Sequence, residues 1–228
     1  MRFSESSYDY GMTEKIDRRR RKTQKAVLDA AEALFIERGY RAASLEAIAE
    51  RADVAVSSIY FNFSGGKSDL YLALAKRAAA INEEVLDPAY DPELDPFEQL
   101  VAVGRAYSRF HLDNPLALRL LSLHDVDREG DERVDAAREE IRASIFSMLE
   151  RLERLVEQAL VAGGNEGVSA RAVTVFVFGS WNGVLSMHSR DQLTTRNLKG
   201  VLHTGEQLVV GAIRSGNAAS LDTKGAVS

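Results

Sequence analysis

From Ser44 to Phe63 the chain reads SLEAIAERADVAVSSIYFNF, and this stretch decides the fold of its N-terminal part. Apolar residues recur there with helical spacing in two short runs, Leu45, Ile48, Ala49 and Ala52, and then Val56, Ile59, Tyr60 and Phe63. Each run places one apolar stripe on a short helix. Only Asp53-Val54-Ala55 separates the runs, which leaves room for a tight turn. The stretch therefore predicts a helix-turn-helix, a motif whose second helix can enter the major groove of DNA.

The outward face of the second predicted helix favours DNA binding over the alternative, a helical hairpin inside a bundle. A helix of about two turns is too short to be stable by itself. Its outward side chains are uncharged, whereas a face that only meets water would normally carry Lys or Glu. Small polar groups suit the edges of bases, and an aromatic ring suits the thymine methyl group. The residues on this face are Ser57, Ser58, Phe61 and Asn62.

The rest of the chain also reads as helix, without strand alternation and without an internal repeat. An apolar stripe over residues 27–35 is ended by Gly39, which suits a helix C-terminus, and Ser44 suits the N-cap of the next helix. The predicted fold class is therefore all-α, with an N-terminal helix-turn-helix head and a larger helical body. Further helices are predicted at roughly 67–86, 96–112, 115–125, 131–162, 168–189 and 195–214.

Prolines and charge divide the chain. Three of the four prolines fall between residues 87 and 96. Residues 1–80 carry 14 Lys and Arg against 11 Asp and Glu, and the remainder carries 15 against 23, for a net charge of −5. A mildly basic module on an acidic body fits DNA binding. We predict a disordered tail at 1–17, a DNA-binding domain at 18–80, a helical body at 81–215 and a flexible tail at 216–228.

The composition argues against several other classes of protein. With 228 residues and 45% hydrophobic content the chain can bury a substantial core, and without cysteine it has no disulfide framework. The N-terminus lacks the apolar segment of a signal peptide. The longest apolar run, 172–187, carries polar residues and is short for a membrane span. We therefore expect a cytoplasmic protein that has no membrane partner.

No pattern typical of an enzyme or of a cofactor site stands out. The four histidines are scattered, and the one suggestive pair, His124-Asp125, offers too few ligands for a metal. Gly66-Lys67-Ser68 matches the end of a phosphate-binding loop, but Phe61 stands where that loop needs its first glycine. There is no Ser/His/Asp spacing and no paired carboxylate. The sequence thus predicts no catalytic residue, no metal and no cofactor.

One part of the chain resembles a known family. Residues 21–70, RKTQKAVLDAAEALFIERGYRAASLEAIAERADVAVSSIYFNFSGGKSDL, resemble the N-terminal domain of the TetR (tetracycline repressor) family of transcriptional regulators. The resemblance implies a homodimer of all-helical subunits. Each subunit would have a three-helix head that binds a palindromic operator in double-stranded DNA, and a larger body that binds a small effector and dimerises. The specific motifs are AAEALFIERGY, Ser44 with Ile48-Ala49, the run from Ser57 to Phe63, Lys67 and Leu70.

The resemblance implies DNA-binding roles for individual residues. Ser44 would cap the supporting helix and touch phosphate, and Tyr60 would bury its ring and direct its hydroxyl group at phosphate. Lys67 would meet another phosphate at the start of the next helix. The basic run at 18–22 either begins a solvated helix or forms an arm that reaches DNA, and we favour the arm, with Arg20 and Arg21. The residues that would face the major groove are Ser57, Ser58, Phe61 and Asn62.

Three departures from the family pattern affect the motif. Asp53 stands where glycine is usual in the turn, and Asp tolerates a left-handed conformation better than most residues. Ala55 replaces the usual serine cap, so that the recognition helix loses a capping bond worth ~1 kcal/mol. One extra residue lies between Phe63 and Lys67 and shifts the start of the next helix.

For the body, the resemblance suggests an effector pocket and a dimer interface formed by the last two long helices. Ordinary core packing is the plainer interpretation of each side chain taken alone. Aromatic residues with a few polar groups suit a mainly apolar pocket, and the candidates are Tyr107, Phe110, His111, Phe146, Phe176, Trp181 and Asn182. The candidates for the dimer interface are Val184, Leu208, Val209 and Ile213.

The sequence therefore predicts a sequence-specific DNA-binding transcriptional regulator, specifically a repressor that a small, moderately hydrophobic ligand releases from its operator. Two alternatives remain open. The first is a DNA-binding protein controlled by a protein partner or by its abundance. The second is a helical enzyme, which needs a converging set of catalytic groups. A cavity of roughly several hundred Å³ in the body would favour the ligand-controlled regulator.

Overall fold

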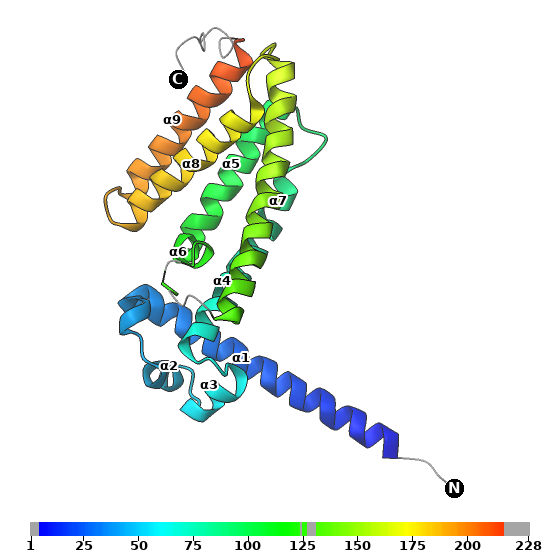
Figure 1. Ribbon diagram of the computed structural model, residues 1–228, viewed down its shortest axis with the longest axis vertical. Helices are drawn as coiled ribbons and strands as arrows, with labels where there is room; N and C mark the ends of the chain where they lie inside the picture. The colour runs from blue at the N-terminus through cyan, green and yellow to red at the C-terminus, as the bar shows by residue number, and fades with distance from the viewer. Residues whose placement is uncertain (1–4, 124, 127–130, 217–228) are drawn as a thin grey trace. The chain divides into compact units, whose positions relative to one another are not determined.

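The chain is described by a computed structural model that covers residues 5–123, 125–126 and 131–216, with side chains from residue 17 onward. All regular secondary structure in these residues is helical, and no strand occurs among them. Figure 1 shows the helices as coiled ribbons. The predicted all-α fold class is confirmed.

The first four helices are α1 (Glu5–Ala42), α2 (Leu45–Arg51), α3 (Val56–Asn62) and α4 (Lys67–Leu86). Within α1 the backbone leaves the helical region at Gly39, with φ 77° and ψ 160°, where the sequence predicted a helix end. The same helix begins at Glu5, whereas the sequence predicted a disordered tail up to residue 17. A helix that is already nucleated gains one hydrogen bond for each residue added, so it can extend without packing.

The turn between α2 and α3 has the predicted local structure. Asp53 adopts a left-handed conformation with φ 54°. Ser44 caps α2, because its side-chain oxygen accepts a hydrogen bond from the Ala47 amide at 3.2 Å. Ala55 caps α3 without any side-chain hydrogen bond. The recognition helix therefore depends on packing rather than on a polar cap.

The remaining elements are a short 3₁₀ helix, η1 (Asp87–Ala89), and five α-helices. The helix α6 is shorter than the predicted span of 115–125, and Leu123 just beyond it has a left-handed φ of 48°, which a continuing helix cannot contain. The predicted flexible tail lies outside the described residues from residue 217 onward. The α-helices are α5 (Pro96–Asp113), α6 (Ala117–Leu121), α7 (Glu132–Ala162), α8 (Ala170–Ser189) and α9 (Thr195–Arg214).

The chain divides into two compact units, which we call the head and the body. The head comprises Met1–Arg77 together with Arg119–Asp135, and the body comprises Ala78–Leu118 together with Ala136–Ser228. The segment 119–135, which the sequence assigned to the body, thus packs with the head. The largest fully buried side chains of the head include Val27, Leu34, Phe35, Ile48, Ile59, Leu70, Tyr71 and Leu74.

Two neighbouring apolar clusters form the core of the body. One is built around Val103, Tyr107 and Leu185, and the other around Val156 and Ile213. These residues come from α5, α7, α8 and α9, so the four long helices share one apolar interior. The start of α5 is fixed by a capping box in which Asp95 accepts from the Phe97 and Glu98 amides.

Candidate nucleic-acid interface and body cavity

The recognition helix α3 is anchored by one side chain and exposes most of the others. Ile59 is completely buried, whereas the Phe61 side chain is 77% exposed. Ser57 is exposed and Ser58 is partly buried. No acidic residue lies on α3. This helix therefore presents hydroxyl groups and an aromatic ring to its surroundings without a negative charge that would repel phosphate.

Two residues at the end of α3 differ from their expected placement. The Tyr60 ring is half-exposed rather than packed in the core, and it lies against the backbone of Gly66. Asn62 is partly buried, and its Nδ2 donates to the carbonyl oxygen of Ser58 at 2.8 Å. One N–H of the Asn62 amide is therefore engaged within α3, while its buried Oδ1 has no hydrogen-bond partner among the described residues.

The basic run at 18–22 continues the exposed surface of α3. All five residues are exposed and lie on α1 as helix, not as an irregular arm. The guanidinium carbon of Arg20 lies 5.9 Å from the centroid of the Phe61 ring, within the range of a cation–π contact. Arg21 is exposed beside it. The contact connects the basic run with the recognition helix.

Lys67 has a different placement from the expected phosphate contact. Its Nζ donates to the carbonyl oxygens of Tyr40 at 2.8 Å, Ala43 at 3.0 Å and Arg41 at 3.2 Å. The ammonium also lies 4.7 Å from the centroid of the Tyr40 ring. Burial lowers the pKa of Lys67 from its ordinary value. The ammonium therefore satisfies carbonyl groups at the end of α1 and does not face outward.

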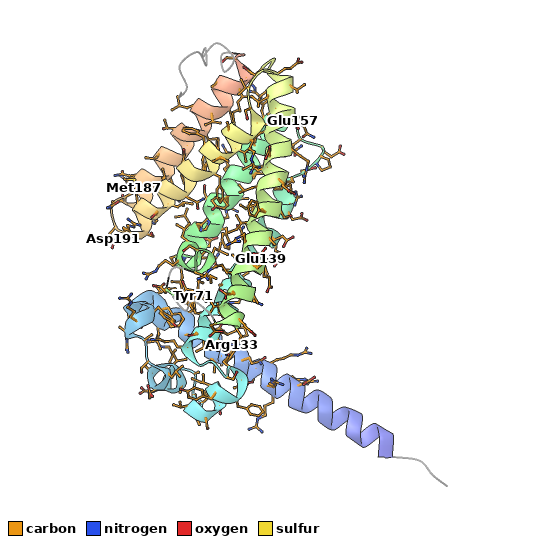
Figure 2. The ribbon with its side chains drawn as sticks, viewed as in Figure 1. Tyr71, Arg133, Glu139, Glu157, Met187 and Asp191 are labelled. Carbon is orange, nitrogen blue, oxygen red and sulfur yellow. The ribbon has the colours of Figure 1, made fainter. Side chains whose placement is uncertain are left out.

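The sequence did not reveal the bonds that hold segment 119–135 to the first turns of α4. The hydroxyl oxygen of the buried Tyr71 lies 2.6 Å from the Arg119 carbonyl oxygen and 3.2 Å from Asp125 Oδ2. Arg133 donates to Asp69 Oδ1 at 3.0 Å. Figure 2 labels Tyr71 and Arg133 within the head. Because their partners are distant in sequence, no local pattern signals them.

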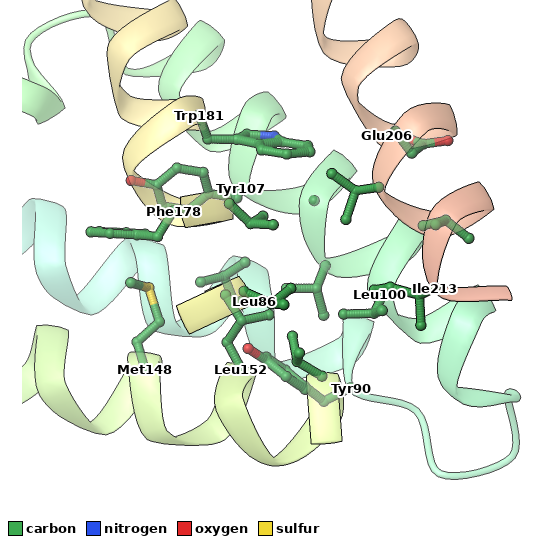
Figure 3. Close-up of a pocket in the computed structure, with 17 residues that line it drawn as sticks. Leu86, Tyr90, Leu100, Tyr107, Met148, Leu152, Phe178, Trp181, Glu206 and Ile213 are labelled. Carbon is green, nitrogen blue, oxygen red and sulfur yellow. The ribbon is translucent and has the colours of Figure 1, made fainter. Parts of the chain in front are cut away.

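The body contains an apolar cavity of about 60 Å³ between α5, α7, α8 and α9. Figure 3 shows Trp181 and Tyr107 on one wall, with Leu152 and Tyr90 opposite. The Tyr107 hydroxyl donates to Asn182 Oδ1 at 2.8 Å, and the Trp181 Nε1 donates to Ser108 Oγ at 3.1 Å. The Tyr90 hydroxyl is buried and has no partner among the described residues.

The cavity brings together two of the seven predicted pocket residues, Tyr107 and Trp181. Asn182 stands behind them as the partner of Tyr107. Phe146 and Phe176 are 51% and 68% exposed, and they do not line the cavity. Phe178, two positions beyond Phe176, lines the cavity together with Trp181 of the same helix, and the sequence did not single it out.

The two other predicted pocket residues, Phe110 and His111, are buried outside the cavity lining. The His111 ring packs edge-on against Tyr107 and Phe110. Neither of its ring nitrogens has a hydrogen-bond partner among the described residues. Burial lowers the pKa of His111 to about 4, so the ring is neutral near pH 7.

The predicted dimer-interface residues do not share one face. Leu208 is 68% exposed, whereas Ile213 is buried and Val209 lines the cavity. Val184 is partly buried against the core. A different set of apolar side chains lies exposed on the last two helices, and it consists of Val175, Phe176 and Met187 on α8 with Val201 and Leu208 on α9. We call this set the outer apolar face.

Neither a metal site nor a membrane-spanning helix is found in the part of the chain that the structure describes. No group of three or more His, Cys, Asp or Glu side chains there could hold a metal ion. No helix in the same residues is long and apolar enough to cross a membrane. His124 of the pair His124-Asp125 lies outside the described residues.

The fold and the exposed α3 define a helix-turn-helix DNA-binding protein of entirely helical architecture. Residues 27–74 match the family described as bacterial regulatory proteins, tetR family. This part of the chain is therefore similar to the DNA-binding domain of the tetR family, and over most of its length the chain is similar to a helix-turn-helix-type transcriptional regulator. The match covers α2 and α3 completely, together with parts of α1 and α4.

Relatives extend the likeness beyond the head. The helix-turn-helix-type transcriptional regulator YvkB of Bacillus subtilis is 24% identical over 85% of this chain and 98% of its own length. The repressor KstR of Rhodococcus jostii is 34% identical over 41% of this chain and 42% of its own length. The fatty acid degradation regulator FadR from Bacillus halodurans shares the fold, with a TM-score of 0.65, 20% identity and coverage of 84% of this chain and 96% of its own.

Proposed function

We propose that this regulator binds a two-fold-related DNA operator as a homodimer, acts as a repressor, and is released by a small, moderately hydrophobic ligand in the body. The observation that carries the proposal is the acid-free, exposed face of α3, joined to the basic run of α1 through Arg20 and Phe61. A face without negative charge that contacts Arg20 of a basic run is suited to a groove between phosphates.

The DNA contacts divide by chemistry. Ser57, Ser58 and Phe61 read base edges in the major groove, because hydroxyl groups hydrogen-bond to bases and an aromatic ring meets the thymine methyl group. Asn62 contributes through the second N–H of its Nδ2, because its Oδ1 is buried and its first N–H is bonded to the Ser58 carbonyl oxygen. Ser44, Arg20, Arg21 and the Tyr60 hydroxyl meet phosphates, which fix the register of the head without reading sequence. Lys67 supports the head from inside.

The second copy of the chain packs on the outer apolar face. Phe176 and Leu208 are both 68% exposed, and large apolar side chains exposed on two helices that pack together suit an interaction site. Gly179 and Gly183 lie on the same helix α8, and a side chain added at either would meet no atom within 4 Å, so a partner helix could approach closely there. The interface is therefore centred on Phe176 and Leu208, with Val184, Val209 and Ile213 behind it.

The ligand occupies the cavity beside Trp181 and Tyr107. Its apolar walls suit a hydrophobic molecule, and the unpartnered Tyr90 hydroxyl offers one orienting hydrogen bond. Ligand sites commonly have volumes of about 300–1,000 Å³. A ligand that fills more than this cavity of about 60 Å³ therefore widens it on entry. If the widened conformation of the body binds DNA less well, the ligand shifts the population of the protein toward that conformation. Ligand binding and DNA binding then weaken each other by the same factor. The repressor role takes support from KstR, which is named a repressor.

A regulator controlled by a protein partner or by its abundance is the second candidate, and the small cavity volume favours it. The two candidates differ in what a ligand does to DNA binding.

A random DNA pool is first selected on the purified protein to find the preferred site. Gel shifts on the full site and on half-sites then test dimeric binding, in which recognition helices lie roughly 34–36 Å apart or somewhat more.

The ligand-controlled proposal expects a compound that changes Trp181 fluorescence and weakens DNA binding by ~1–3 kcal/mol of coupling. Trp181 is the only tryptophan of the chain, so the signal reports on the cavity wall. Compounds that bind without any effect on DNA affinity would favour control by a partner. A reporter gene behind the selected site separates repression from activation.

A further inference from the structure

The apolar cavity adjoins a second, more open hollow in the body. This groove has a volume of about 370 Å³ and lies between α5, α8 and α9. Gly104, Trp181 and Glu206 line both the cavity and the groove. The two hollows therefore share a wall. The charged and polar side chains of the groove include Arg105, Ser108, Arg109, Lys199, His203 and Glu206.

Trp181 forms much of the shared wall. Its indole rests on α5 at Gly104, where an added Cβ would lie 3.4 Å from the ring carbon Cζ2. The indole N–H is held by Ser108 Oγ at 3.1 Å. One hydrogen bond to Ser108 and the contact with Gly104 hold this ring, so a single side chain with two rotatable bonds separates the cavity from the groove at this point.

The cavity itself suits a slender apolar chain. A site needs ~10–15 Å³ of this measure to hold one water-sized group. At about 60 Å³ the cavity has room for a short row of such groups and not for a fused ring system. Leu100, Val103, Leu152 and Val177 contribute to its aliphatic walls.

The groove carries the opposite chemistry. Arg105 is engaged with Glu206, with its Nη2 2.9 Å from Glu206 Oε1. Arg109 and Lys199 are exposed, and neither forms an ion pair within the described residues. The remaining carboxylate of the lining is Asp113, at the end of α5. Arg109 and Lys199 thus outnumber the remaining carboxylate by one positive charge, in a groove that adjoins the apolar cavity.

We propose that the effector is an aliphatic monoanion, whose chain enters the cavity past Trp181 and whose anionic head lies in the groove at Arg109 and Lys199. This assignment rests on the proposed ligand-controlled function and names the class of its ligand. A charged head gains charge-assisted hydrogen bonds to the two cations and avoids the burial of charge in the cavity. The chain gains from the removal of apolar surface from water.

The test uses the full-length protein and four matched series of straight-chain compounds. These are carboxylates from butanoate to dodecanoate, with the alkyl sulfates, alcohols and alkylammonium ions of equal chain length. Calorimetry and Trp181 fluorescence measure binding. We expect carboxylates and sulfates to bind roughly tenfold or more tightly than alcohols of equal length, and ammonium ions to bind most weakly. Equal affinity for carboxylates, alcohols and ammonium ions would overturn the assignment.

Variants of the protein test the contacts of the anionic group separately from those of the alkyl chain of the ligand. Arg109→Glu with Lys199→Glu should remove the preference for carboxylates over alcohols while alcohols still bind. Arg142→Glu together with Arg171→Glu is the matched control, because both arginines are exposed residues of the body outside the groove. Val177→Phe should weaken all four series by narrowing the cavity. An unchanged carboxylate preference in the groove variant would place the anion elsewhere and overturn the assignment.

DNA binding is measured in parallel on the selected site. Carboxylates that bind with the expected preference but leave DNA affinity unchanged would uphold the ligand class and defeat the proposed release from DNA. A neutral or cationic compound that releases DNA, while no anion binds, would uphold the release and defeat this assignment. Anions that bind and release DNA support both.

Discussion

The ammonium of Lys67 lies 2.8 Å from the carbonyl oxygen of Tyr40 and thereby joins the start of α4 to the end of α1. The last carbonyl groups of a helix have no partner within that helix, and a buried cation can satisfy several of them at once. Here the same ammonium also reaches the carbonyl of Ala43, just before α2. The Lys67 side chain thus connects the start of α4 both to the end of α1 and to the residue that precedes the N-cap of α2.

We predict that Lys67→Met lowers the stability of the head and leaves the salt dependence of DNA binding unchanged. The variant keeps an apolar stem but leaves carbonyl groups unsatisfied, which should reduce the free energy of unfolding by roughly 1–3 kcal/mol. Urea titration measures the stability, and binding to the selected site at several salt concentrations measures the slope. Arg21→Ala is the comparison, expected to reduce the slope by about one unit. A reduced slope for Lys67→Met would restore it as a phosphate contact.

We predict that Phe61 and Arg20 affect DNA binding differently, although they touch each other. Phe61→Ala should cost roughly 1–3 kcal/mol on the preferred site and little on unrelated DNA, since it removes a base contact. Arg20→Ala should weaken binding to both kinds of DNA and flatten the salt dependence. Competition gel shifts with specific and random duplexes distinguish the two. Equal losses of Phe61→Ala on both DNAs would show that its ring serves only to hold Arg20.

The local features of the head could be predicted because each depends on neighbouring residues. The cap at Ser44, the left-handed Asp53 and the buried Ile59 follow from spacing and from backbone preferences over a few positions. The inward placement of Lys67 could not, because its acceptors lie 24 to 27 residues earlier in the chain. The bond between Asp69 and Arg133 spans 64 residues and leaves no local pattern.

In the body, the sequence could not predict which side of each helix faces the cavity. α8 is apolar on several sides, so its sequence does not show which side faces the cavity. Phe176 and Phe178 are separated by two positions, and a helix turns by roughly 200° over two residues. Phe178 therefore lines the cavity while Phe176 is exposed. Only the packing of α5, α7 and α9 around α8 decides between them.

We predict that Phe176→Glu combined with Leu208→Glu converts the protein to monomers. Both side chains are largely exposed in the single chain, so the change should leave the fold intact while it places charges in the proposed interface. Sedimentation measures the mass, and circular dichroism confirms the helices. Phe146→Glu is the control, because Phe146 is 51% exposed on α7, outside the outer apolar face. A double variant that remains dimeric would assign the interface to other residues.

We predict that His111 makes the protein sensitive to acid. Its pKa is lowered by burial from 6.5 to about 4 in the folded state, so the unfolded chain binds more protons between these values. Stability contributed by the neutral ring is complete above about pH 6.5 and is lost as the pH falls toward 4, by an amount on the order of 3 kcal/mol. His111→Met should be at least as stable as the wild type at pH 7, because it removes two unpartnered ring nitrogens, and should lose less stability at pH 5. Urea unfolding at a series of pH values measures both effects, with His203→Gln as the exposed control that retains the acid loss. Parallel pH profiles for His111→Met and the wild type would show that another group causes the acid sensitivity.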